Sequence, residues 1–292
     1  MNESSDTLAE KKAWARWTLI INPVATLHDL NLKGVWQYRY LIYLFVKRDF
    51  VARFKQTILG PLWFIIQPLL TTVMFTVVFG KIANIPTDGL PKILFYMTGI
   101  VSWTYFSSCL NATSTTFVSN ASLFGKVYFP RLTIPLSVVI SNLATFLIQF
   151  VLLLGFMVYF WIKGSQIYLS AYVLLLPFLL SLMAGMGLGF GIIVSSLTTK
   201  YRDLTCLVAF GVQLWMYATP VVYPVSFLPE NYKNIIMVNP LAPIIETFRF
   251  ALLGVGTFSF LYLAYSFVFT TVILFVGLLL FNRVEKTFMD TV

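Results

Sequence analysis

Six long apolar stretches constrain the fold of this chain more than any other feature. A helix needs about 20 mostly apolar residues to cross the hydrocarbon core of a bilayer. The runs that approach or exceed this length are 62–80, 93–118, 134–161, 168–197, 205–222 and 257–281. Because a membrane span must satisfy its backbone hydrogen bonds internally, such long and uniformly apolar runs predict helices rather than barrel strands. We therefore expect an all-α integral membrane protein with six transmembrane helices.

The positions of the basic residues predict the orientation of these spans. Only 11% of the 292 residues are charged, against about a quarter in soluble domains. Nine of the twenty lysines and arginines precede Pro61, and six more fall in segments on the same side of the membrane. Cytoplasmic segments carry such an excess, so both termini are expected in the cytoplasm. The net charge of +9 thus reflects topology, and we expect no nucleic-acid partner.

The segment 36–61 is expected to form an amphipathic interface helix between a cytoplasmic tail, 1–35, and the first span. At about 100° per residue, Phe50, Val51, Phe54 and Ile58 share one face. The other face holds Arg48, Asp49, Ala52, Arg53, Lys55 and Gln56, with Asp49 and Arg53 spaced to pair. Two interpretations stay open: a membrane anchor among anionic headgroups, or a lever that a cytoplasmic partner pushes.

The six spans form one predicted transmembrane domain, 62–285, followed by a short cytoplasmic tail, 286–292. Its cytoplasmic loops, about 119–133 and 198–204, are too short to hold a catalytic domain. The proline-rich segment 223–256 is too broken for two crossings, and we expect two short re-entrant helices in the outer leaflet. Asn239-Pro240 predicts a helix start, Glu246 and Arg249 stand three residues apart in this helix, and Gly254 predicts its end.

The sequence lacks the motifs of an enzyme that acts alone. It has no GxxxxGK[ST] loop for a nucleotide, no zinc motif beside its single histidine, His28, and no Ser-His-Asp set. Cys109 and Cys206 fall in apolar runs and predict inert side chains. We therefore expect a transport subunit that binds no metal or cofactor itself. The spans carry no acidic or basic residue near their middles, and most secondary carriers need such residues at membrane depth. A secondary carrier is therefore disfavoured, and a carrier or channel stays only as an alternative.

Two groups in the second span are candidates for a transport path. Thr104, Ser108, Asn111 and Thr115 share one helix face, and they predict either hydrogen bonds between helices or the wall of a hydrophilic passage. Trp103, Tyr105 and Phe106 predict either an interfacial aromatic belt or rings that stack on sugars along the passage. In the fourth span, Gly185 and Gly189, and Gly187 and Gly191, have the spacing that lets helices approach closely.

Several motifs resemble, in order, those of the membrane subunit of ABC-2 type polysaccharide exporters. The resemblance covers about residues 36–285. The first motif runs from Arg48-Asp49-Phe50 through Lys55-Gln56-Thr57 to Leu59-Gly60-Pro61-Leu62-Trp63 and Gln67-Pro68-Leu69. The later ones are Phe129-Pro130-Arg131 with Pro135-Leu136, Tyr201-Arg202-Asp203-Leu204, Thr219-Pro220-Val221-Val222-Tyr223-Pro224, and Asn239-Pro240-Leu241 followed by Arg249 and Leu253-Gly254.

The resemblance implies a half-transporter: a homodimer forms the channel, and two separate ATPase subunits bind ATP and Mg. Residues implied to couple to the ATPase are Arg48, Asp49, Arg53, Lys200, Arg202 and Asp203. Residues implied at an outer gate are Tyr223, Asn239, Glu246 and Arg249. The implied substrate is a glycan such as O-antigen, capsule or teichoic acid, carried on polyprenyl diphosphate across the bacterial cytoplasmic (inner) membrane. Arg48, Arg53 and Lys55 would attract the diphosphate.

Two other functions remain as alternatives. The first is an ABC-2 exporter of a drug or small lipid, and the second is a secondary carrier or channel. A membrane-embedded glycosyltransferase is disfavoured, because the sequence shows no cluster of carboxylates to hold a metal-bound sugar nucleotide.

Overall fold

The structure is a computed structural model that describes residues 32–55, 58–124, 126–127, 129–165, 167–198, 201 and 203–291. For Leu32, Lys33, Phe54, Ala121 and residues 284–291 it describes the backbone alone. Residues 31–292 form one compact unit, and its described part is helical without a strand. This confirms the predicted all-α class. Most of the predicted tail, 1–35, lies outside the described residues.

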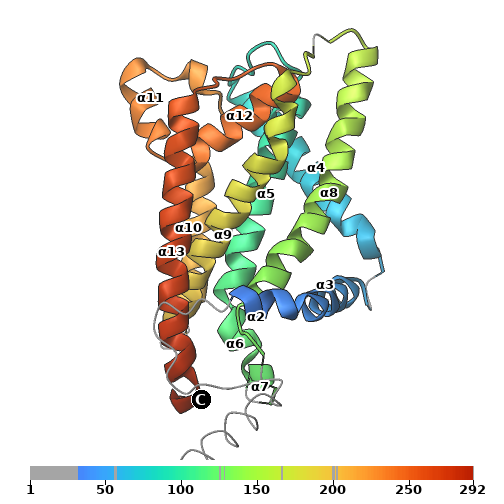
Figure 1. The fold of residues 1–292 in the computed structure, drawn as a ribbon. Helices are drawn as coiled ribbons and strands as arrows, with labels where there is room; N and C mark the ends of the chain where they lie inside the picture. Colours follow the sequence, from blue (N-terminus) through green and yellow to red (C-terminus); the bar gives the residue numbers. More distant parts are fainter. Residues whose placement is uncertain are drawn as a thin grey trace, which may run out of the picture. The chain divides into compact units, whose positions relative to one another are not determined.

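Five helical segments are long and apolar enough to cross a membrane (Figure 1). They are Gly60–Ile82, Lys92–Ser114, Thr133–Ile162, Ala171–Thr198 and Phe260–Arg283. Their helices are η1 (Gly60–Leu62), α4 (Trp63–Phe75) and the π-helical η2 (Thr76–Ile82), α5 (Lys92–Ser114), α8 (Thr133–Ile162), η3 (Ala171–Leu175) with α9 (Leu176–Thr198), and α13 (Phe260–Thr291). Short helices α6 (Thr116–Ser119) and α7 (Ala121–Phe124) follow α5.

The predicted span 205–222 is shorter in the structure. Helix α10 covers Leu204–Tyr217, and 14 residues rise only about 21 Å. Residues 218–221 form turns before Pro224, so the apolar sequence continues while the helix does not. Helix α10 packs on α5 and α9, and it leads to the end of the molecule that holds the re-entrant segment. It takes the place of the fifth predicted span.

Helix α5 lies at the centre of the packing, with α4, α8, α9, α10 and α12 around it. Glycines on two faces of α9 allow the neighbouring helices α5 and α13 to pack closely against it. A Cβ atom on Gly191 would lie 2.5 Å from Thr113 Cβ in α5, and one on Gly189 would lie 2.7 Å from Ile273 Cγ2 in α13. The predicted close packing at these glycines is therefore confirmed, with a different partner helix on each face.

Helices α2 (Leu32–Gln37) and α3 (Arg39–Phe54) lie at the end of the molecule that the sequence predicts to face the cytoplasm, where α3 packs against α8 (Figure 1). The predicted interface helix 36–61 is too long, because Lys55 has extended backbone angles and helical structure resumes only at Gly60. Phe45 of α3 is buried within the chain, whereas Val51 and Ile58 of the predicted apolar face are exposed. The predicted pairing of Asp49 with Arg53 is wrong, since Asp49 pairs with Arg48 at 2.8 Å.

The predicted pair of short helices is confirmed at the opposite end of the molecule. After η4 (Val225–Phe227), helices α11 (Glu230–Met237) and α12 (Leu241–Leu253) meet at a bend of 103°. Gly254 ends α12 in the left-handed conformation, with φ +71°, as its position in the sequence predicts. Ser226 Oγ donates to Asp88 Oδ1 at 2.7 Å, and Ser170 N donates to Ala251 O, so this segment lies with the loops after η2 and α8.

Candidate functional site

A polar stripe runs along a face of α5 that the rest of the chain covers only partly. Thr104, Ser108, Asn111 and Thr115 are half-buried, while most of their neighbours in α5 are buried. The Thr115 hydroxyl donates to Ala112 O at 3.3 Å. Within the described part of the chain, the side chains of Thr104, Ser108 and Asn111 form no hydrogen bond. The chain therefore presents unpaired polar groups outward at membrane depth, where each unsatisfied group is costly in lipid.

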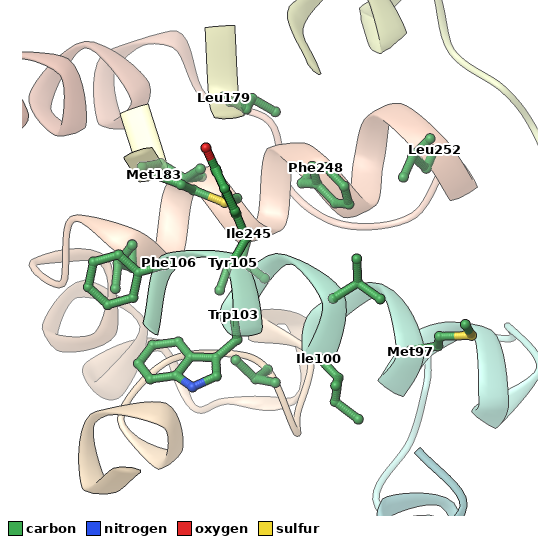
Figure 2. Packing of buried hydrophobic residues seen from close by; sticks show 14 of the residues in the cluster. Met97, Ile100, Trp103, Tyr105, Phe106, Leu179, Met183, Ile245, Phe248 and Leu252 are labelled. Atoms are coloured by element: carbon green, nitrogen blue, oxygen red, sulfur yellow. The ribbon is translucent and has the colours of Figure 1, made fainter. Parts of the chain in front are cut away.

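The three aromatic residues of the same span lie elsewhere. Trp103, Tyr105 and Phe106 are only 6%, 4% and 1% exposed, in a core that α5 forms with α9 and α12 (Figure 2). The Phe106 ring packs on Trp215 of α10 with 5.3 Å between centroids, and Tyr105 packs on Phe146 of α8 with 5.2 Å. These side chains are core residues of this chain, rather than the exposed wall or interfacial belt that the sequence suggested. Only the polar stripe has the exposure expected of a passage.

Arg53 connects the interface helix directly to a transmembrane helix. Its Nη2 donates to Asn142 Oδ1 at 3.0 Å, and its Nη1 donates to Thr145 Oγ1 at 3.3 Å. Asn142 is buried, and its Nδ2 has no partner in the described part of the chain. Helix α3 is thus fixed to the first half of α8 through a guanidinium group that contacts two positions of that helix. Both the anchor and the lever interpretations of α3 remain predictions.

The remaining residues predicted to contact an ATPase are described only in part. Lys200 and Arg202 lie outside the described residues. Asp203 precedes the first turn of α10, where its backbone carbonyl accepts the amide of Cys206. A carboxylate at a helix N-terminus is favourable because of the helix dipole. Arg48 lies near the surface, with its guanidinium 4.8 Å from the centroid of Phe45. The coupling roles of Asp203 and Arg48 remain predictions.

The predicted outer gate contains a buried ion pair. Glu246 and Arg249 are each 1% exposed, and Arg249 Nη1 donates to Glu246 Oε1 at 2.7 Å. Arg249 Nη2 also donates to Pro220 O at 2.9 Å, and the guanidinium lies 3.9 Å from the ring centroid of Phe95. Glu246 Oε2 accepts the amide of Thr257 at 3.2 Å. One ion pair therefore holds α5, α12 and the segments on either side of the re-entrant pair together.

Asn239 and Tyr223 fasten the approach to the same segment. Asn239 Nδ2 donates to Thr219 Oγ1 at 2.8 Å, and its Oδ1 accepts the amide of Leu241 at the start of α12. The Tyr223 hydroxyl donates to Tyr217 O at 3.3 Å. The four residues predicted for an outer gate thus all lie in or beside the re-entrant segment, and they stabilise its conformation. Their role in gating remains a prediction.

Sequence reasoning missed Asn142 and Thr145 as partners of Arg53. The polar pair Ser141-Asn142 inside the apolar run 134–161 was the available signal, because polar side chains in a span need partners. Among the described residues, no three His, Cys, Asp or Glu side chains lie close enough to hold a metal ion.

Comparison with known proteins identifies relatives of this chain and the family model that it matches. The chain is 28% identical over 264 residues to the O-antigen export system permease protein RfbA of Klebsiella pneumoniae, covering 89% of this chain and 99% of that protein. It is 27% identical over 221 residues to RfbA of Myxococcus xanthus, covering 75% and 82%. It is 24% identical over 245 residues to the polysialic acid transport protein KpsM of Escherichia coli, covering 84% and 93%. Residues 40–253 match the family model described as ABC-2 type transporter. This chain belongs to the ABC-2 type transporter family.

Proposed function

We propose that this chain is the membrane subunit of an ATP-driven exporter of a polysaccharide across the bacterial cytoplasmic membrane. Its relatives are named for O-antigen export and for polysialic acid transport, and the similarity covers nearly their whole length. Two different glycans among the relatives support a polysaccharide as the substrate class. The implied polyprenyl diphosphate carrier belongs to the same proposal.

The observation that carries the proposal is the half-buried polar stripe of α5. Lipid cannot satisfy the hydroxyl and amide groups of Thr104, Ser108 and Asn111, so a second protein surface or water must cover them. Two copies that turn these stripes toward each other would enclose a polar passage, whose hydroxyls and amides suit a hydrated glycan. A homodimer is therefore part of the proposal.

A separate ATPase subunit supplies the energy in this scheme. The chain has no P-loop motif of its own, and it is a transport component rather than an enzyme. Helix α3 offers a cytoplasmic surface, and Arg53 joins this helix to Asn142 and Thr145 of α8. A partner that moves α3 when it binds or hydrolyses ATP would therefore move α8. ATP and Mg are bound by that partner.

Export of a drug or small lipid is the main alternative, and the experiment that separates the two uses the assembled complex. The tagged chain is purified in mild detergent with the P-loop protein that accompanies it, and the pair is reconstituted into liposomes. A lipid-linked glycan should stimulate ATP hydrolysis and become accessible to a glycosidase on the opposite side. The same complex with its partner's P-loop lysine replaced is the control. Stimulation by small amphiphiles but not by the glycan would favour the alternative, and hydrolysis-independent movement would favour a carrier.

A further inference from the structure

The membrane-facing surface of the chain contains a groove that the transport proposal does not use. It has a volume of about 980 Å³ and lies between Ile65 of α4, Ile93 of α5 and the outer half of α8. Its wall on α8 runs from Ile148 to Lys163. The lining is almost entirely apolar apart from Tyr159 and Lys163. Water is a poor occupant of such a groove at membrane depth, whereas hydrocarbon is a good one.

The length of the groove fits an acyl chain of one leaflet. Ile148, Leu152, Gly155, Tyr159 and Lys163 recur every three or four residues, so they form one continuous stripe on α8. Fifteen residues of helix rise about 22 Å, which exceeds the roughly 15 Å hydrocarbon depth of a single leaflet. Helix α8 starts after a cytoplasmic loop, so its Lys163 end is the outer end. The stripe therefore crosses the outer leaflet.

Gly155 keeps the middle of this stripe open. A Cβ atom placed on Gly155 would meet no other atom within 4 Å, in contrast to the glycines of α9 that contact neighbouring helices. Gly155 is thus not required for helix packing within this chain. A larger side chain at this position would project into the groove without disturbing the packing of α8 against α5.

Lys163 places a positive charge at the outer end of the groove. It is exposed directly after α8, and its ammonium lies 5.0 Å from the ring centroid of Tyr159. No carboxylate pairs with Lys163 within the part of the chain that the structure describes. An ammonium without a counter-charge and a tyrosine at the membrane surface form a favourable environment for a phosphate group.

We infer that this groove binds an anionic glycerophospholipid of the outer leaflet, with one acyl chain along α8 and the phosphate at Lys163. The positive charge of Lys163 favours an anionic lipid over other occupants of the groove. A zwitterionic lipid offers the same phosphate but also carries a positive group that Lys163 repels, so Lys163 favours a lipid with a net negative charge. A purely apolar protein surface would leave Lys163 unpaired. The inference does not depend on the substrate that the exporter carries.

Native mass spectrometry of the purified full-length chain tests the inference. The protein is mixed with equal amounts of phosphatidylglycerol and phosphatidylcholine that carry the same acyl chains. One basic residue at a membrane surface favours an anionic lipid by about fivefold. We expect that preference in the unmodified protein and in Lys163→Arg. We expect Lys163→Gln to bind both lipids equally. Lys81→Gln, at an exposed lysine outside the groove, is the matched control and should keep the preference.

A second variant tests the groove itself. Gly155→Phe should reduce binding of both lipids, because the ring occupies the space of the acyl chain. An unchanged preference for phosphatidylglycerol in Lys163→Gln would overturn the assignment of the phosphate to Lys163. Unchanged binding in Gly155→Phe would overturn the groove as the site. A polyprenyl phosphate that displaces phosphatidylglycerol would assign the groove to the carrier lipid instead, and absence of any bound lipid would indicate that protein covers it.

Discussion

The side chain of Arg53 shows how much of the proposed coupling depends on one residue. It extends from an amphipathic helix at the membrane surface and reaches Asn142 and Thr145, about 90 positions later in the sequence. A guanidinium presents several donors in a fixed planar arrangement, so it holds two acceptors at once. Movement of α3 therefore cannot occur without either moving α8 or breaking both hydrogen bonds.

Replacing Arg53 by alanine should weaken the coupling between ATP hydrolysis and export. We expect more ATP hydrolysed for each glycan exported by reconstituted complexes, because α3 would move without α8. Asn142→Leu should have the same effect from the other side of the contact. Lys47→Ala is the matched control, since Lys47 is an exposed basic residue of the same helix and has no predicted coupling role. An unchanged ratio in both Arg53→Ala and Asn142→Leu would contradict this role.

Glu246 and Arg249 stabilise the re-entrant segment only as a pair. Removing one partner leaves the other charge buried, which typically costs about 3–5 kcal/mol. Glu246→Gln should therefore lower the thermal unfolding temperature of the purified protein strongly. Glu230→Gln is its control, because Glu230 forms an exposed pair with Lys233 that is worth less than about 1 kcal/mol. Similar unfolding temperatures for the two variants would show that the buried pair contributes little.

At the scale of elements, helix α9 is held from two sides by close contacts. Gly187 and Gly191 face α5, and Gly185 and Gly189 face α13. Gly277 of α13 approaches in turn, since its Cβ atom would lie 2.9 Å from Gly189 O. These contacts bring backbones together, so they cannot adjust by a change of side-chain rotamer. These contacts hold α5, α9 and α13 closely together.

Gly191→Ala should destabilise the protein by separating α5 from α9. The added methyl group would lie 2.5 Å from Thr113 Cβ and 3.0 Å from Leu110 O, so a backbone must shift. Overpacking of this kind typically costs about 1–3 kcal/mol. Gly211→Ala in α10 meets nothing within 4 Å, and it should be neutral or stabilise the helix by about 0.5–1 kcal/mol. Thermal unfolding in detergent compares the two, and equal melting temperatures would contradict the packing argument.

The elements also show what the sequence could and could not predict. The span positions, the glycine contacts and the start and end of α12 follow from local patterns, because periodicity, small-residue spacing and capping residues act within a few positions. The end of α3 at Phe54, the partners of Arg53 and the buried positions of Trp103 and Phe106 depend on which helices meet. Those contacts join residues far apart in the chain, and one amphipathic or aromatic pattern is compatible with several of them.

For the whole molecule, the partly uncovered polar stripe of α5 implies that a single copy is incomplete. A water-filled passage and a dry protein interface would both cover the stripe, and the two differ in their access to solvent. Ser108→Cys, with the exposed Cys206 replaced by serine, distinguishes them. We expect a water-soluble, membrane-impermeant thiol reagent to label Ser108→Cys in the assembled transporter, because the proposed passage contains water.

A second position provides the control for this labelling. Thr271 of α13 lies on an exposed face beside Phe267, Val268 and Phe275, which is the composition of a lipid-facing surface. Thr271→Cys in the same background should therefore remain unlabelled. Equal labelling of both positions would indicate a reagent that enters the bilayer. Labelling of neither would favour a dry contact between helices over a passage.

The surroundings of the buried ion pair also bear on how the chain is inserted during synthesis. Arg249 contacts Phe95 and Pro220, which are made before it, and Glu246 needs only the amide of Thr257, which is made shortly after. All partners of both charges are thus present before most of α13 leaves the ribosome. Glu246 and Arg249 of α12 can therefore pair and pack against helices that are already in the bilayer. Helix α13 can then pack onto this assembled part of the chain. The order of the partners along the chain thus allows the costly burial of both charges before the last helix joins the assembly.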